Sequence, residues 1–175
     1  MPRADPAARR SPAAVVVRPL GPDDLAAAEA LVAATLAGRH QARLGATVDV
    51  LALPGLGAWA GDRLVGLATW SPPGAGRRSE LAALAVARPG PQAGQGAALV
   101  ESAAEAARAA GAVAQWLVTT NDNLDALRLY QRHGYRLTAL RPGALDVARA
   151  SKPSIPRLGR DGIPLRDELV LQQDL

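Results

Sequence analysis

Residues 80–110 have the pattern of a strand, a glycine-rich loop and a long helix, which restricts the chain to folds that combine a sheet with helices. The expected strand, Glu80–Ala87, is almost wholly apolar after Glu80, as a central buried strand would be. The loop ends in Gly94-Gln95-Gly96, and an alanine-rich helix follows as far as Ala110. Free N–H groups and a partial positive charge at this helix start predict an anion site, and a pyrophosphate is its natural occupant.

Two other phosphate-binding patterns fit this segment poorly. A P-loop needs Lys and then Ser or Thr after its last glycine, but Ala97 follows Gly96. A Rossmann fingerprint needs a third glycine where this chain has Leu99, and its loop is shorter. A purely structural explanation stays open, in which Gly94 and Gly96 only permit a turn and close packing of the helix.

The composition excludes several classes of protein. The 175 residues, 49% of them hydrophobic, suffice for one domain with a core, and the lack of Phe leaves Ala, Leu and Val to build it. Because there is no Cys and only two His, we expect neither disulfides nor a metal site. No apolar run approaches the roughly 20 residues of a membrane span. We therefore expect a cytoplasmic protein.

The positive charge of the chain is concentrated at its start. Residues 1–18 carry four Arg and one Asp, so they supply +3 of the net charge of +4. The remaining body is almost neutral and shows no stripe of basic residues interleaved with aromatic ones. We expect residues 1–13 to be a flexible basic leader, residues 14–175 to form a single domain, and nucleic acid not to be a partner.

Apolar periodicity and turn signals predict the other elements. Residues 37–53 are ambiguous, with a short second helix as one interpretation, and residues 141–164 form an excursion rich in Pro and Gly. The helices are expected at Leu25–Leu36, Gly94–Ala110 and Asn123–His133, and the strands at Val15–Val17, Leu56–Ala60, Leu64–Trp70, Glu80–Ala87, Val113–Val118, Tyr135–Leu140 and Leu165–Leu171.

Two segments resemble consecutive motifs of the GNAT-type N-acetyltransferases. Residues 84–100, LAVARPGPQAGQGAALV, are similar to the pattern Leu-x-Val, a loop, Gln/Arg-x-x-Gly-x-Gly/Ala and an apolar helix. Residues 119–135, TTNDNLDALRLYQRHGY, are similar to the pattern of Asn, then Ala-x-x-x-Tyr, then Gly and an aromatic residue. The tail, with Lys152-Pro-Ser-Ile-Pro156 and Gly162-Ile-Pro-Leu-Arg-Asp-Glu168, resembles an uncharacterised bacterial subgroup. One departure is Pro91, which occupies the Gln/Arg position, so one phosphate contact is lost or is replaced by Gln92.

The resemblance implies an α/β (α+β) fold, the GNAT fold. Its mixed, mostly antiparallel twisted sheet has six to seven strands, about four flanking helices, and a splay between the fourth and fifth strands. Acetyl-CoA would lie in the splay as cosubstrate, without a metal. The acceptor would be a primary amine of a small molecule or peptide, and a homodimer is possible because the last strand offers an edge. The cofactor-binding residues it implies are Leu84, Ala85, Val86, Gln92, Ala93, Gly94, Gln95, Gly96, Ala97, Asn121 and Asn123.

The resemblance also implies two catalytic residues. Tyr130 would protonate the departing thiolate, although its spacing from Leu124 and Leu127 equally suits a core stripe. Glu80, the only charged residue of its strand, would take the amine proton directly or through water.

Several site assignments have structural alternatives. Glu80 could be a solvent-exposed strand end, or could pair with Arg77 or Arg78. Asn123 suits a helix cap better than a cofactor contact, and for Asn121 both possibilities stay open.

The predicted activity is therefore transfer of an acetyl group from acetyl-CoA to a primary amine. The alternative is a non-catalytic acyl-CoA-binding or regulatory module on the same fold.

Overall fold

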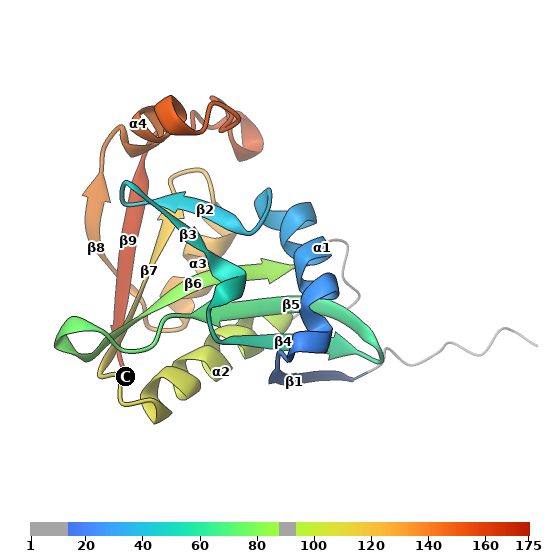
Figure 1. Cartoon of the computed structure of the whole chain (residues 1–175). Helices are drawn as coiled ribbons and strands as arrows, with labels where there is room; N and C mark the ends of the chain where they lie inside the picture. Colours follow the sequence, from blue (N-terminus) through green and yellow to red (C-terminus); the bar gives the residue numbers. More distant parts are fainter. Residues whose placement is uncertain (1–13, 88–93) are drawn as a thin grey trace, which may run out of the picture.

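The computed structural model describes residues 14–87 and 94–175. These residues form a seven-stranded sheet of order β1-β4-β5-β6-β7-β9-β8, a separate two-stranded sheet of β2 and β3, and four α-helices (Figure 1). The strands are β1 (Val15–Pro19), β2 (His40–Arg43), β3 (Ala46–Asp49), β4 (Gly55–Ala60), β5 (Arg63–Trp70), β6 (Arg78–Val86), β7 (Ala114–Thr120), β8 (Arg136–Arg141) and β9 (Glu168–Asp174). The helices are α1 (Leu25–Leu36), α2 (Gln95–Ala109), α3 (Leu124–Arg132) and α4 (Ala144–Ser151).

The seven-stranded sheet opens in its middle. Its first four strands are antiparallel, and so are β7, β9 and β8. Between the two halves, β6 and β7 run parallel and pair only where Arg78–Glu80 face Ala114–Trp116. Beyond that point β6 continues to Val86 and β7 to Thr120 with no further pairing between these two described strands. The splay expected between the fourth and fifth predicted strands is thus confirmed.

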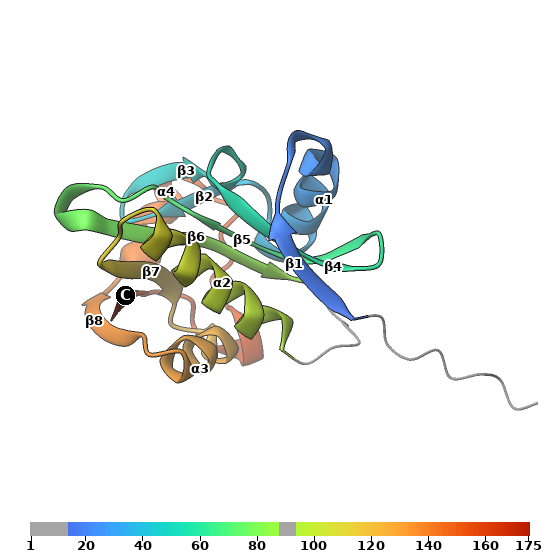
Figure 2. The same cartoon turned by 90° about the horizontal axis from the view of Figure 1, so that it is seen from below.

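Helices cover both faces of the first half of the sheet (Figure 2). On one face Leu99, Val100 and Ala103 of α2 pack against alternate strand residues such as Val65. On the other face α1 packs against a second set of strand residues that includes Leu67. Each buried Leu side chain contributes about 1.5–3 kcal/mol through removal from water. The expected core of Ala, Leu and Val is confirmed, with two buried tyrosines added to it.

Most of residues 37–53 forms a hairpin, and the short helix considered from the sequence is limited to a single 3-10 turn at Val50–Ala52. Strands β2 and β3 pair through a two-residue turn at Leu44-Gly45, where φ is +50° and +78°. Two consecutive residues with positive φ are typical of the tight turn whose twist matches a hairpin, and Gly45 supplies one of them at little cost. Figure 1 shows this hairpin crossing the open side of the splay.

Two predictions for the C-terminal third were wrong in detail. The excursion at 141–164 contains α4, which begins after Gly143. The last strand begins at Glu168 rather than Leu165, because the preceding residues bind to loops instead of a sheet partner. This strand is also not an edge: β9 lies between β7 and β8, and β8 ends the sheet.

Two further sequence predictions concern membrane-spanning helices and the leader at residues 1–13. No helix in the described part of the chain is long and apolar enough to cross a membrane. The expected leader, residues 1–13, lies outside the described residues.

Candidate active site

The splay between β6 and β7 is occupied by two adjoining cavities of about 160 Å³ each. Both are lined by Leu36, Leu84, Asn123 and Tyr130, so they form one continuous depression, which we call the splay groove. Its walls come from the unpaired parts of β6 and β7, from α3 and from the end of α1. The groove therefore exists because the two parallel strands stop pairing after three residues.

The wall formed by β6 has a free backbone edge. Leu84, Ala85 and Val86 all line the splay groove, as the sequence predicted for cofactor contacts. On their other side they pair with β5. An extended ligand can add to such an edge as a further strand would, because every second residue directs its N–H and C=O outward.

The start of α2 lies at one end of this groove. Gly94 caps the helix with φ of +107°, and the first intrahelical bond runs from Ala98 N to Gly94 O (2.9 Å). The N–H groups of Gln95, Gly96 and Ala97 therefore have no acceptor within the helix and are available to an anion, and the anion site expected here stays a prediction. A Cβ on Gly96 would lie 3.3 Å from Leu129 Cδ2 and 3.8 Å from Val86 Cγ2, both groove residues.

Two of the predicted cofactor-binding residues belong to the loop before α2. Gln92, Ala93 and the unusual Pro91 lie outside the described residues. The Gln95 side chain is buried, and neither of its polar atoms has a hydrogen-bond partner within residues 14–87 and 94–175. A buried amide without partners is costly, so this position is suited to a ligand that supplies them.

Tyr130 is the only tyrosine of the described residues that lines the splay groove. It is 8% exposed, and its ring meets that of Tyr135 edge to face at a centroid distance of 5.7 Å. Burial raises the pKa of Tyr130 above its ordinary value of 10, because ionisation is disfavoured away from water. The phenol therefore keeps its proton at neutral pH. Tyr130 belongs to both the core and the groove, whereas Leu124 of the supposed core stripe is exposed.

The two asparagines have different roles: the cap favoured for Asn123 is not formed by its side chain, and the alternatives left open for Asn121 resolve to a structural one. Asn123 occupies the N-cap position of α3, but its side chain makes no capping bond within the described residues and instead lines the groove. Asn121 donates to Pro164 O (2.8 Å) and accepts from the N–H groups of Arg166 and Asp167 (3.0 Å each). The structure thus brings Asn123 to the groove, while the Asn121 amide holds the C-terminal excursion.

Glu80 is neither a solvent-exposed strand end nor a partner of Arg77 or Arg78. Its carboxylate forms a close ion pair with Nε of Arg43, at the end of β2, and its side chain is only 12% exposed. Arg77 donates to Gly111 O instead. The described lining of the groove does not include Glu80.

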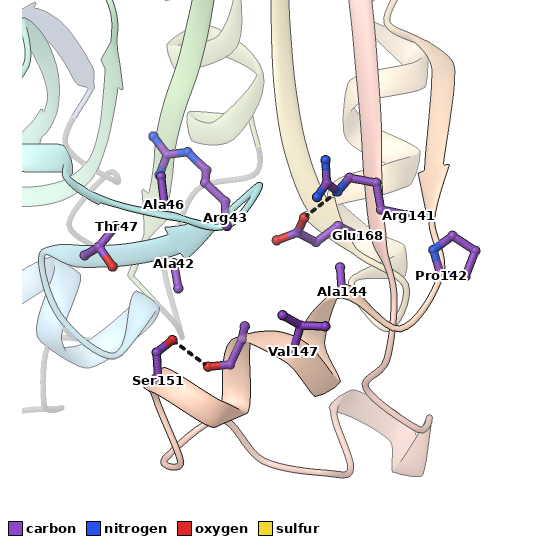
Figure 3. A pocket seen from close by; sticks show the side chains of 12 residues that line it. Ala42, Arg43, Ala46, Thr47, Arg141, Pro142, Ala144, Val147, Ser151 and Glu168 are labelled. Atoms are coloured by element: carbon purple, nitrogen blue, oxygen red, sulfur yellow. Dashed lines mark hydrogen bonds and ion pairs between the residues drawn. The ribbon is translucent and has the colours of Figure 1, made fainter.

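A larger cavity of about 370 Å³ adjoins the splay groove (Figure 3). We call it the outer cavity. It lies between the β2–β3 hairpin, the end of β8, α4 and the start of β9. Ala42, Arg43 and Glu168 line both the outer cavity and the groove, so these residues mark the junction of the two.

Glu168 is the functional candidate that sequence reasoning missed. It is 3% exposed, accepts the Leu44 N–H with both oxygens at 3.2 Å, and lies 3.4 Å from Nε of Arg141. A usable signal was present, because Glu168 ends the tail pattern that begins at Gly162 and starts an apolar strand, just as Glu80 does. Arg43 had no such signal, since its segment was ambiguous.

The excursion at 141–164, which precedes Glu168 in the chain, is held in place by hydrogen bonds from side chains and by one position that must be glycine. Arg149 on α4 donates to the carbonyls of Ile155, Pro156 and Leu165 at 2.5–3.1 Å. Asp122 accepts the N–H of Arg160, and a Cβ on Gly159 would lie 2.1 Å from that carboxylate. Only glycine permits this close approach. The course of the excursion, and with it the position of Glu168, therefore depends on the contact between Gly159 and Asp122.

The family model for "Acetyltransferase (GNAT) family" matches residues 35–135, more than half of the chain. The uncharacterised protein YxbD of Bacillus subtilis (strain 168) is 49% identical over 82 residues, which are 47% of this chain and 52% of YxbD. The chain spans about half the length of the curated relatives it matches. We conclude that the chain belongs to the GNAT acetyltransferase family.

Solved structures share the fold over nearly the whole chain. An IAA acetyltransferase from Bacillus cereus ATCC 14579 matches with a TM-score of 0.71 and 20% identity, covering 93% of this chain and 100% of its own. A GNAT family acetyltransferase from Elizabethkingia anophelis with acetyl-CoA bound matches with a TM-score of 0.69 and 18% identity, covering 92% and 98%. The GNAT fold expected from the sequence is confirmed.

Proposed function

We propose that the protein transfers an acetyl group from acetyl-CoA to a primary amine. One observation supports this above others: the groove between β6 and β7 contains Tyr130 in its wall and the start of α2 at its end. The relative from E. anophelis, which has acetyl-CoA bound, shares this fold. The acceptor reaches the groove through the outer cavity.

The described residues suit acetyl-CoA as cosubstrate. The pantetheine arm, an extended chain with amide groups, adds along the free edge of β6 at Leu84–Val86. The pyrophosphate takes the N–H groups of Gln95, Gly96 and Ala97, where the helix dipole favours an anion. Asn123 contacts the arm from the opposite wall. The missing side chain at Gly96 keeps the start of α2 close to Leu129 and Val86.

The chemistry needs two proton transfers. The neutral amine attacks the thioester carbonyl carbon, the C–N bond forms, the C–S bond breaks, and sulfur leaves with the bonding electron pair. Tyr130 gives its proton to that sulfur, and its raised pKa ensures that it carries a proton to give. The amine loses one proton. Glu80 is the predicted base and would act through water, since its carboxylate already binds Arg43.

We place the enzyme in the cytoplasm, where acetyl-CoA is made and used. A homodimer stays a prediction, and its edge would be β8, whose residues are all exposed and include Leu137 and Leu140.

Thermal unfolding in the presence of acetyl-CoA, CoA and ATP tests the proposal. A ligand at about 100 times its Kd stabilises the native state by roughly 2.7 kcal/mol, which raises Tm by about 5–10 °C for a chain of this size. We expect this shift with both CoA species and not with ATP. If neither CoA species shifts Tm, the proposal is wrong. A shift without thiol release from acetyl-CoA across an amine panel would instead support the non-catalytic binding module.

A further inference from the structure

The charged groups around the outer cavity are arranged in a way that constrains the acceptor. Three charged side chains line it: Arg43, Arg141 and Glu168. Figure 3 shows Glu168 between the two arginines, with Arg141 joined to it and the guanidinium of Arg43 pointing away from α4. Because Arg43 is already paired with Glu80, a ligand in the cavity meets one carboxylate, Glu168, and one accessible cation, Arg141, which favours a ligand that carries both an amine and a negative charge.

Glu168, the one carboxylate among the described lining residues of the outer cavity, lies beside the position at which the amine would react. Glu168 lines both the cavity and the splay groove, and the groove also holds Tyr130. An ammonium that approaches the thioester from the outer cavity therefore meets Glu168 at the junction, and it gives up one proton to solvent before the neutral amine attacks. Since an ammonium is a donor without acceptor capacity, this carboxylate is its natural partner.

The arginines provide the complementary half of the site. Arg141 lines the outer cavity and not the groove, and its side chain is 47% exposed, so its remaining nitrogens are accessible from the cavity side. Arg43 is 8% exposed, and its two terminal nitrogens have no hydrogen-bond partner in the part of the chain that the structure describes. The terminal nitrogens of Arg43 are buried and point away from α4, so Arg141 is the cation that the oxygen atoms of a ligand in the outer cavity would meet.

The rest of the cavity is small and mostly apolar, with Thr47 and Ser151 as its polar residues. Its wall is formed mainly by Ala42, Ala46, Ala144, Val147 and Ala148. A volume of about 370 Å³ is near the lower end of ligand pockets, which run from roughly 300 to 1,000 Å³. This space suits a short aliphatic group and excludes a folded protein surface.

We propose that the acceptor is a small amino acid with an aliphatic side chain. Its amine lies against Glu168 at the junction, its carboxylate binds Arg141, and its side chain occupies the alanine-lined part of the outer cavity. This inference rests on the proposed acetyl transfer from acetyl-CoA, because it assigns the second substrate of that same site.

Initial rates of thiol release from acetyl-CoA, compared at equal concentrations of neutral amine, test the assignment with three acceptors: L-valine, L-valinamide, in which a neutral amide replaces the carboxylate, and isobutylamine, which lacks the whole group. We expect kcat/KM for L-valine to exceed that for L-valinamide by at least about tenfold, the worth of one charged hydrogen bond. Arg141→Gln should remove most of this preference. Arg136→Gln, a matched exposed arginine at the other end of β8, should keep it.

The outcomes separate the two proposals. Equal or better rates with L-valinamide, isobutylamine or a short peptide, or a preference that survives in Arg141→Gln, would overturn the amino acid assignment and leave acetyl transfer standing. A rise in Tm with acetyl-CoA but no thiol release with any acceptor would overturn both proposals and support the non-catalytic binding module. If acetyl-CoA fails to raise Tm, the proposed function itself fails. Arg141 is largely exposed, so its replacement should leave the acetyl-CoA shift in Tm unchanged.

Discussion

The two cavities that meet at Arg43 and Glu168 are built in different ways. The splay groove is formed mainly by two short stretches, at the end of β6 and from the end of β7 into α3, each continuous in sequence. The outer cavity is formed by the β2–β3 hairpin together with α4 and the start of β9, which follow the hairpin in the chain by more than ninety residues. A continuous stretch leaves a readable pattern, whereas a cavity assembled from distant segments leaves almost none. We therefore expect variants of the two cavities to affect different substrates.

The largest effect is expected in the groove, at Tyr130. Tyr130→Phe keeps the ring and its contact with Tyr135 but removes the proton donor, so kcat should fall by about 10²-fold or more. The KM for acetyl-CoA should change little. Because burial raises the pKa of Tyr130, the wild-type rate should show no loss from its ionisation below pH 10. Steady-state kinetics of both proteins from pH 6 to pH 10 provide the measurement.

Tyr135→Phe is the control for this substitution. Tyr135 is equally buried, and its hydroxyl donates to Gln115 (2.6 Å) instead of reaching the groove. The Tyr135→Phe variant should be less stable than the wild type, and its kcat should be unchanged. A Tyr130→Phe enzyme with the wild-type kcat would remove Tyr130 from the mechanism.

The next largest difference is expected between Glu168, at the junction, and Glu80, which lies behind it as the partner of Arg43. Glu168→Gln should raise the amine KM by about tenfold, because the ammonium loses its ionic partner while the amide can still accept from Leu44. Glu80→Gln tests the base predicted from the sequence and should lower kcat at neutral pH without raising the amine KM. Measuring kcat and KM separately distinguishes these roles. An unchanged kcat in Glu80→Gln would mean that solvent takes the proton.

Two substitutions, each of which enlarges one small side chain, compare the two cavities directly. Gly96→Ala places a Cβ 3.3 Å from Leu129 Cδ2 and should raise the KM for acetyl-CoA about fivefold. Ala148→Leu fills part of the outer cavity and should raise the KM of the amine by a similar factor.

Gly74→Ala and Ala150→Leu are the matched controls for this pair. Gly74 has open space around its Cβ position, and Ala150 is an exposed residue of α4. Both should keep both KM values. If Gly96→Ala and Ala148→Leu each changed both KM values equally, the two cavities would not bind different substrates.

The smallest effect is expected outside both cavities, at Asp24 before α1. Hydrogen bonding to Arg18 lowers the pKa of Asp24 to about 2. A carboxyl with a lowered pKa stabilises the fold above its ordinary value of 3.8, and this stabilisation is lost as the pH falls to about 2. The urea midpoint of Asp24→Asn should therefore lie slightly below that of wild type at pH 7, and the two should converge near pH 2. A difference that persists at pH 2 would contradict this explanation.

The predictable parts of the fold were those with local signals. Glu80 at the head of an apolar strand, Gly94 before an alanine-rich helix and Tyr130 after Asn123 each belong to a pattern within about twenty residues. Leu84, Ala85 and Val86 were placed correctly beside the groove for the same reason. Their contacts with acetyl-CoA remain predictions.

What the sequence could not predict depends on contacts between distant segments. The ion pair of Glu80 joins residues 37 positions apart, and the bond from Leu44 to Glu168 spans 124 positions. Asn121 was ambiguous because an asparagine at a strand end can hold either a ligand or a loop, and here the loop comes from Pro164 to Asp167. The hairpin at β2–β3 was missed because its strands are only four residues long.

The central claim is that the groove and the outer cavity are occupied together, so that the acetyl group passes directly from sulfur to nitrogen at their junction. Initial rates of thiol release, measured with the amine varied at several fixed acetyl-CoA concentrations, test this claim most directly. Direct transfer within a ternary complex predicts double-reciprocal lines that intersect. Parallel lines would indicate a covalent acetyl-enzyme and sequential use of a single site, and would contradict it.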